Sequence, residues 1–359
     1  MIAHFVYNYL TYSGAAGQVN KLANSLSKLG LFESVIFNVQ TIEGDDSKVI
    51  IKNGRQIIIN LPRNIFLRVV ISFYFLHKFK VKLVHLHGFH KPAIIIAKLL
   101  NIPILLKSTL LGQDDVNSLL KKNKLNKTLL SFVCKINCLN NVIYDINKCE
   151  IDESKLEIIP NGVVIREPLA THEFQREQDS YIFVGAIVKR KSPLEVIKYF
   201  KTNYLCSQNA KLYFLGPNDS SLPEFDSRYY KQCLDECGLL LNKNIFFLGN
   251  ISRHELEQYY LNSTAMIFFS KKEGTPNVVL EAMSLNCPIV HKSDDIIVKS
   301  LLGMELGNLL DSQTASSYSS NKFSEISNSG CLRNRATLFS IDEIARKHCE
   351  LYENIIRNY

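Results

Sequence analysis

Short apolar runs alternate with amphipathic stretches along the whole chain, and they do so in two series. Such alternation predicts parallel strands joined by crossover helices, which is a doubly wound α/β sheet. The runs of the first series are Phe5–Tyr9, Ser34–Val39, Ile57–Leu61, Leu83–Leu86, Ile102–Leu106 and Asn141–Ile146. Those of the second series are Tyr181–Val184, Ala210–Leu215, Ile245–Leu248, Ala265–Phe269 and Pro288–Val290. Because 359 residues exceed one ordinary core, each series is expected to form its own domain.

The predicted boundary between the two domains lies in a polar stretch, residues 167–180. We expect an N-terminal domain over residues 1–165 and a C-terminal domain over residues 180–338. Within the second domain, residues 312–331 are rich in Ser and Asn and predict a loop region. Residues 339–359 predict a terminal helix.

The net positive charge of the chain lies in its first half. The net charge of the whole chain is +8, but residues 61–135 alone hold 13 Lys and Arg against 2 Asp and Glu. Such one-sided charge predicts that this domain faces a polyanion, either a membrane surface or a nucleic acid. Apolar residues are interleaved with basic ones at Arg63, Arg68, Lys78, Lys80 and Lys82, and again at Lys121, Lys122, Lys124 and Lys127.

Alternating apolar and basic side chains are typical of a helix that lies at the surface of an anionic membrane. The alternative is a buried helix whose basic face is merely solvated. Nucleic acid is not expected as a partner, because the chain has neither a recognisable binding module nor an aromatic platform. No run reaches the roughly 18 apolar residues that a membrane-spanning helix needs.

The nine cysteines include no Cys-x-x-Cys pair, and their number is odd. Free thiols in a reducing cytosol explain this pattern better than disulfides or a metal site. The first residues, Met1–Tyr7, lack the basic region and the cleavage site of a signal peptide. We therefore expect a cytoplasmic protein.

The sharpest chemical signal is a strand end, Glu273, a loop that contains Gly274 and Pro276, and a helix that contains Glu281. Backbone amides at a helix start bind phosphate, helped by the positive end of the helix dipole. The flanking carboxylates cannot hold phosphate, but they can accept hydrogen bonds from sugar hydroxyls. The residue set therefore fits a nucleotide sugar. The alternative is that both glutamates are helix-start charges with a favourable place in the dipole.

The run from Glu273 to Met283 resembles the Glu-(seven residues)-Glu motif of the retaining glycosyltransferases of family 4. These enzymes have the GT-B fold, in which two Rossmann-like doubly wound domains face a cleft. The resemblance implies that Glu273 holds hydroxyls of the donor sugar and that Glu281 binds the ribose diol. The backbone that would meet the sugar and the phosphates belongs to Gly274, Thr275, Pro276, Asn277, Val278 and Val279.

The same family opens its second domain with a strand, a Gly-Arg pair and then a lysine. Here Gly185 follows a predicted strand, and Lys191 falls at the lysine that neutralises the leaving diphosphate. Ala186 stands in place of the family arginine, and the resemblance leaves Arg190 as a substitute. The remaining donor-binding residues that the resemblance implies are Gly216 and Asn250.

In the first domain, Gly14 and Gly17 match the glycine-rich loop that faces the cleft in the family. His87 matches a strand-end histidine of the family, and it is either a cleft residue or a core histidine. Leu111 replaces a histidine that many members place near the reacting sugar, so that role is not carried over. The resemblance also implies that the terminal helix, residues 339–359, crosses back to the first domain.

The resemblance implies a hexosyltransferase that moves a hexose, with retention, from a UDP-linked sugar to a hydroxyl of a lipid-linked saccharide. The setting it implies is bacterial surface-polysaccharide synthesis, such as lipopolysaccharide O-antigen, by a peripheral protein at the inner face of the plasma membrane. No cofactor and no metal are expected, because the chain contains no Asp-x-Asp triplet. Catalysis would then rest on Glu273, Lys191 and helix amides. The alternatives are an epimerase or phosphorylase of the same fold, and an inactive protein that binds a sugar nucleotide or an anionic polymer.

Overall fold

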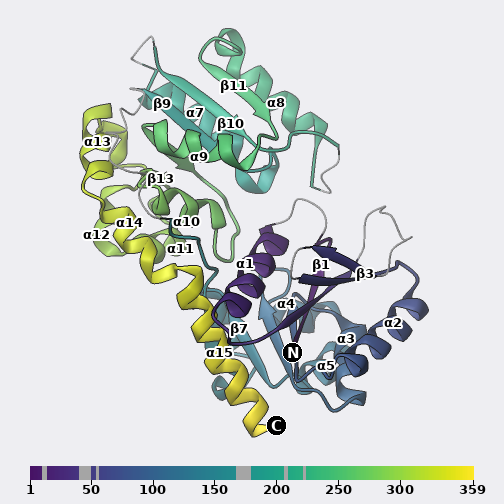
Figure 1. The fold of residues 1–359 in the computed structure, drawn as a ribbon. Coiled ribbons are helices and arrows are strands. Elements are labelled where there is room, and N and C mark those ends of the chain that lie inside the picture. The colour runs from purple at the N-terminus through teal and green to yellow at the C-terminus, as the bar shows by residue number, and fades with distance from the viewer. Residues whose placement is uncertain (10–13, 40–49, 54–55, 167–178, 206–208, 221–223) are drawn as a thin grey trace. The chain divides into compact units, whose positions relative to one another are not determined.

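The computed structural model describes residues 1–9, 14–39, 50–53, 56–166, 179–205, 209–220 and 224–359 (Figure 1). The chain divides into two compact units. Unit 1 comprises Met1–Val164 and Phe339–Tyr359, and unit 2 comprises Ile165–Leu338. The polar stretch in which we placed the boundary lies, over residues 167–178, outside the described residues.

Unit 1 is built on an 8-stranded sheet with the order β3-β4-β2-β1-β5-β6-β7-β8. Its neighbouring strands are parallel except β3 and β4, which are antiparallel. In sequence order the strands are β1 (Ile2–Tyr7), β2 (Ser34–Val39), β3 (Ile50–Asn53), β4 (Gln56–Leu61), β5 (Leu83–His87), β6 (Ile104–Ser108), β7 (Lys135–Cys138) and β8 (Leu156–Ile158).

Helices cover both faces of this sheet, because side chains alternate along each strand. On β1, Ile2 packs with the helices α1 (Gly14–Lys28) and α15 (Ile341–Asn358), whereas Ala3 and Phe5 belong to the core on the other face. Helices on that other face are α2 (Ile65–Lys78), α3 (Lys91–Leu99), α4 (Val116–Lys122), α5 (Leu125–Ser131) and α6 (Asn141–Asn147). Unit 1 is thus the doubly wound α/β domain that the sequence predicts.

Two expectations for unit 1 are wrong. Asn141–Ile146, expected as a strand, is helix α6, because the side chain of Asn140 accepts a hydrogen bond from the backbone N of Ile143 at 2.9 Å and starts a helix there. The strand at this place is β7. The lysines from Lys121 to Lys127 do not share one helix, since Asn123 separates α4 from α5.

Unit 2 has a 5-stranded, fully parallel sheet with the order β11-β10-β9-β12-β13. Its strands are β9 (Ser180–Val184), β10 (Lys211–Leu215), β11 (Ile245–Gly249), β12 (Ala265–Phe268) and β13 (Ile289–His291). Its helices are α7 (Pro193–Asn203), α8 (Ser227–Cys237), α9 (Arg253–Asn262), α10 (Asn277–Ser284), α11 (Ile296–Leu302), α12 (Met304–Leu309), α13 (Ser320–Asn328) and α14 (Cys331–Ala336).

Residues 312–331, expected as a loop region, contain helix α13. The helix is rich in serine and asparagine, but it has a short apolar stripe in which Phe323 and Ile326 are buried. The described cysteines are free thiols, and Cys206 lies outside the described residues. Among the helices described here, none has the length and apolar character that crossing a bilayer requires.

Candidate functional site

Two loops that carry predicted site residues meet at one edge of the unit 2 sheet. Strands β9 and β12 are parallel neighbours, so the loops that follow them leave the sheet at the same edge. The loop after β9 contains Lys191, and the loop after β12 contains Glu273. A backbone hydrogen bond from Lys271 N to Arg190 O, 2.9 Å long, joins the two loops.

Lys191 and Glu273 form the centre of this site. The Lys191 ammonium lies 2.5 Å from Oε1 of Glu273, and Ser270 Oγ donates to the same oxygen at 2.5 Å. The two charged side chains are only 17% and 15% exposed, so water screens this pair less than a surface pair. Two residues that are 82 positions apart in the sequence therefore form one partly buried ion pair.

Arg190 lies beside this pair and contacts two carboxylates. Its Nε and Nη2 each donate to an oxygen of Glu224 at 3.0 Å, and its Nη1 lies 3.4 Å from Oε1 of Glu273. A guanidinium that is held by two parallel hydrogen bonds is fixed in orientation. Ala186 stands at the family arginine position and has no charge. Arg190 supplies the second cation beside the Glu273 carboxylate.

Helix α10 begins directly after the Glu273 loop. Pro276 is its N-cap residue, and its first turn contains no acidic side chain. The positive end of the helix dipole is therefore not neutralised by its own residues. Gly274 and Thr275 are buried, and Glu281 lies about one turn inside the helix and is half-buried.

Gly185 and Gly216 bring the ends of β9 and β10 close together. Gly216 has φ +144°, and a Cβ at this position would lie 2.3 Å from the carbonyl oxygen of Gly185. Gly185 itself has φ +146°. Both positions are in the left-handed region, which L residues rarely adopt, so glycine is required here for conformation and for space.

Replacing Gly216 with alanine is therefore expected to lower the free energy of unfolding of unit 2 by about 3 kcal/mol or more, because backbone must move. Urea unfolding followed by circular dichroism measures this loss. Gly330→Ala is the matched control, since it has φ +71° but no atom within 4 Å of the added Cβ. It should cost only about 1–2 kcal/mol. Equal losses in both variants would contradict the packing argument.

The other predicted donor residue, Asn250, is exposed and follows β11. It precedes helix α9, whose start is fixed by a capping box between Ser252 and Glu255. The structure therefore places Gly185, Gly216 and Asn250 after three neighbouring strands of one parallel sheet.

The residues predicted in unit 1 occupy two different environments. Gly14 and Gly17, expected in a loop, lie in the first turns of α1 and are exposed. His87 is buried, and its Nε2 lies 3.1 Å from Nδ1 of His4. His85 joins them, and these three rings form a cluster that was not predicted from the sequence. The sequence signal for this cluster was the His-x-His spacing of His85 and His87 on one strand, because residues two apart on a strand point to the same face of the sheet.

Comparison with known proteins identifies relatives of unit 2 and of the whole fold. Residues 166–335 match the family model described as Glycosyl transferases group 1. A capsular polysaccharide biosynthesis glycosyltransferase of Staphylococcus aureus, CapH, is 27% identical over 191 residues, which are 51% of this chain and 50% of that protein. The chain spans half or less of the length of the first curated relatives it matches.

Solved structures share the fold over nearly the full chain. Sucrose-phosphate synthase from Thermosynechococcus elongatus superposes with a TM-score of 0.74 at 15% identity, covering 100% of this chain and 99% of that one. Anabaena Alr3699/HepE, in complex with UDP and glucose, superposes with a TM-score of 0.69 at 11% identity, covering 98% and 99%. The predicted fold class, two Rossmann-like doubly wound domains of the GT-B type, is confirmed.

Proposed function

Because residues 166–335 match the model of the Glycosyl transferases group 1 family, we propose that this chain transfers a hexose from a nucleotide-diphosphate sugar to an acceptor hydroxyl. The observation that carries the proposal is the Lys191–Glu273 pair beside the start of α10. A cation, a carboxylate and the positive end of a helix are the groups that a sugar diphosphate needs.

In the proposed reaction, the bond between the anomeric carbon and the phosphate oxygen breaks, and the acceptor oxygen bonds to the same face of the sugar. The acceptor proton leaves with the nucleoside diphosphate. Lys191 and Arg190 stabilise the negative charge that develops on the leaving diphosphate, and Glu273 accepts hydrogen bonds from donor hydroxyls. These groups supply the charge without a metal cofactor, so we propose transfer without one.

Glu281 has a separate role in this proposal, which is to hold the ribose of the nucleotide. The Anabaena protein with the same fold binds UDP, so UDP is the first nucleotide to test. Glu281→Gln is expected to weaken UDP binding by about 1.5–3 kcal/mol, because a carboxylate accepts stronger hydrogen bonds from a diol than an amide does. Isothermal titration calorimetry measures the change.

Glu305→Gln, an exposed change in the same unit, should leave UDP affinity unaltered and serves as the control. Unchanged affinity in Glu281→Gln would remove this residue from the site. The reaction itself is tested by mass spectrometry of nucleotide sugars incubated with and without saccharide acceptors. Release of nucleoside diphosphate together with a hexose-extended acceptor supports transfer, and conversion of the sugar nucleotide without acceptor contradicts it.

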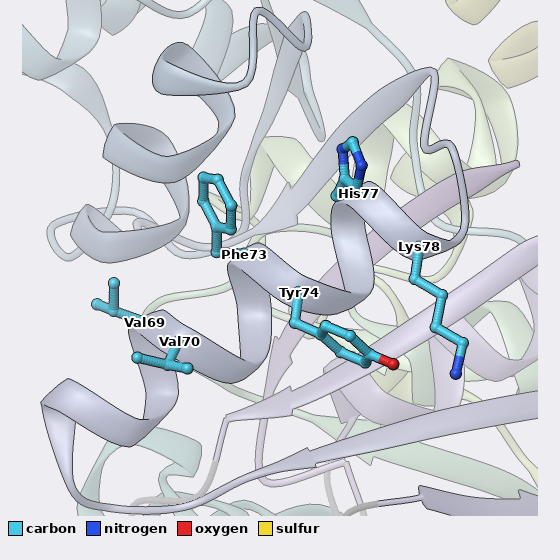
Figure 2. A pocket seen from close by; sticks show the side chains of 6 residues that line it. All are labelled: Val69, Val70, Phe73, Tyr74, His77 and Lys78. Atoms are coloured by element: carbon cyan, nitrogen blue, oxygen red, sulfur yellow. The ribbon is translucent and has the colours of Figure 1, made fainter.

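We further propose that the acceptor is lipid-linked and that unit 1 binds an anionic membrane at the inner face of the plasma membrane. Helix α2 supports this with an exposed apolar surface, in which Phe66 and Ile65 are 72% and 57% exposed. Its outer side chains line a hollow of about 360 Å³. Figure 2 shows these side chains, which are Val69, Val70, Phe73, Tyr74, His77 and Lys78. Exposed apolar patches of this kind mark interaction sites.

Basic side chains of the same unit complement an anionic surface. Lys121, Lys122, Lys124 and Lys127 are all exposed on α4, α5 and the turn between them. At about 1 kcal/mol for each basic residue near anionic lipid, these four contribute about 4 kcal/mol, which is enough for reversible binding. The setting that fits such a protein is surface-polysaccharide synthesis, since the relative CapH is a glycosyltransferase of capsular polysaccharide biosynthesis.

The chain is expected to sediment with vesicles that contain phosphatidylglycerol and to remain in solution with neutral vesicles. Binding should weaken as salt rises, because the Debye length falls from ~10 Å at 0.1 M to ~3 Å at 1 M. Replacing Lys121, Lys122, Lys124 and Lys127 with serine should weaken sedimentation, and so should Phe66→Ser with Phe73→Ser. Leu239→Ser, at an even more exposed apolar residue of unit 2, should change nothing. Equal sedimentation with both vesicle types would show that the basic surface is only solvated.

A further inference from the structure

Unit 1 contains a group of buried histidines that the proposed transfer reaction does not use. His4 lies on β1, and His85 and His87 lie on the adjacent strand β5. His4 is paired in register with His85, and His87 is two residues further along, so all three rings lie on one face of the sheet. Their exposed fractions are 0%, 0% and 4%.

The ring nitrogens of this group are spaced like the ligands of a metal ion. One nitrogen from each of the three residues lies within 4.8 Å of the other two. His4 Nδ1 and His87 Nε2 are 3.1 Å apart. Two nitrogens bound to one tetrahedral zinc ion at ~2.0–2.1 Å are roughly 3.3 Å apart, so this pair already has the required spacing. The third nitrogen needs a shift of about 1 Å or more to reach the same ion.

The second nitrogen of two of these rings is fixed by another side chain. His4 Nε2 lies 3.3 Å from Ser34 Oγ, and His85 Nδ1 lies 2.7 Å from the hydroxyl of Tyr352 on α15. Metal-bound histidines usually donate their other N–H to such a partner, which sets the tautomer and the ring orientation. With its Nδ1–H donating to Tyr352, His85 directs the lone pair of its Nε2 away from that contact, and this nitrogen has no partner among the described residues.

His348 of α15 closes the group from the helix side. Its ring centroid is 5.2 Å from that of His85, and both of its nitrogens are buried without a hydrogen-bond partner in the described structure. Burial of a polar group without a partner is unfavourable, so the cluster needs a further ligand or donor to be satisfied.

Charge is the remaining requirement, because only neutral imidazoles bind metal. Burial lowers the pKa of His4 to about 3 and the pKa of His85 and His87 well below the ordinary value, so all three are neutral at pH 7. Lys107, opposite His87 on β6, is the competing cation. Burial lowers its pKa to about 8, so it stays mostly protonated at pH 7, and its ammonium donates to Asn161 Oδ1 at 2.9 Å.

We propose that His4, His85 and His87 bind a divalent transition-metal ion of the zinc type, with His348 or a water molecule as the fourth ligand. The site is closed to solvent, so the metal has a structural role and not a catalytic one. It ties β1 to β5, and His348 as the fourth ligand would also tie α15 to them.

The test uses the full-length, untagged chain, expressed in zinc-supplemented medium and desalted. Metal analysis should find about one zinc ion per chain in the parent protein, and expression with Co²⁺ should produce the visible absorption of a tetrahedral cobalt site. His87→Gln and His85→Gln should lose the metal. His90→Gln is the matched control. His90 lies between β5 and α3 and is buried as His87 is, but it stacks on Tyr7 and is not in the group. It should keep the metal.

A parent chain that holds no zinc and shows no cobalt absorption would overturn the site, whatever the variants do. Retention of metal by His87→Gln and His85→Gln, as in the control, would overturn it too. If either variant fails to fold, the cobalt spectrum of the parent chain alone decides whether the site exists. Each readout is metal content or absorption, so the outcome does not depend on sugar transfer.

Discussion

Replacing Lys191 with methionine is expected to lower the rate of sugar transfer by about 10²–10³-fold. Methionine keeps most of the length of the side chain and removes the charge, so the leaving diphosphate loses a cation at the position where its charge develops. The Glu273 carboxylate keeps the hydrogen bond from Ser270 and the contact with Arg190, so the loop should remain in place. Steady-state kinetics with a saturating donor measures the effect.

Lys189→Met is the matched control for this prediction. Lys189 belongs to the same short 3-10 turn as Lys191, but its side chain is exposed and has no part in the Glu273 contacts. Its transfer rate should stay within about twofold of the parent rate, since exposed charges contribute little. A fall in the apparent second-order rate constant with kcat unchanged in Lys191→Met would mean that the lysine binds the donor equally in ground and transition states. Equal rates in both variants would exclude Lys191 from catalysis.

Acidification from pH 7 to pH 5.5 is expected to destabilise unit 1 by about 7 kcal/mol, which is comparable to the total stability of a domain, ~5–15 kcal/mol. Burial lowers the pKa of His4 and His90 to about 3, and it also lowers the pKa of His85, His87 and His348 well below the ordinary value. In the unfolded chain the same groups titrate near ~6.5.

The sign follows from proton binding. Below pH 6.5 the unfolded chain takes up protons that the folded chain excludes, so the free energy of unfolding falls by about 1.4 kcal/mol per pH unit for each of these histidines. The neutral histidines contribute fully to the free energy of unfolding only above about pH 6.5, and this contribution is lost progressively as the pH falls toward 3. Urea unfolding of the metal-free chain at several pH values measures the slope, and hydrogen exchange of peptides from β1 and β5 assigns it to unit 1.

Two variants separate this effect from general acid denaturation. His348→Leu removes one buried titrating group whose nitrogens have no partner in the described structure, so its slope below pH 6.5 should be smaller by about 1.4 kcal/mol per pH unit. His254→Gln changes an exposed histidine on α9 and should leave the slope as it is. A slope in His348→Leu that equals the parent slope would contradict a neutral, buried His348.

Local sequence patterns were enough to predict most of the strands and the residue types of the donor site. Ser34–Val39 was predicted with the bounds that β2 has, because a run that is buried on both faces is mostly apolar. The prediction failed at Asn141–Ile146, where an equally apolar run is a helix because one asparagine caps it. It also failed at α13, because the polar composition of this segment predicts a loop although Phe323 and Ile326 are buried. Short runs of this kind do not distinguish helix from strand by periodicity alone.

The sequence by itself determined the two alternating series, the motif from Glu273 to Glu281 and the residue types at the candidate site, because these depend on neighbours along the chain. Only the tertiary structure decided which of these residues meet. Lys191 reaches Glu273 because β9 is next to β12, and His4 reaches His87 because β1 is next to β5. Strand order follows from the packing of the whole domain, which no local pattern encodes. Contacts between residues more than 80 positions apart, including the histidine cluster, therefore appeared only in the folded chain.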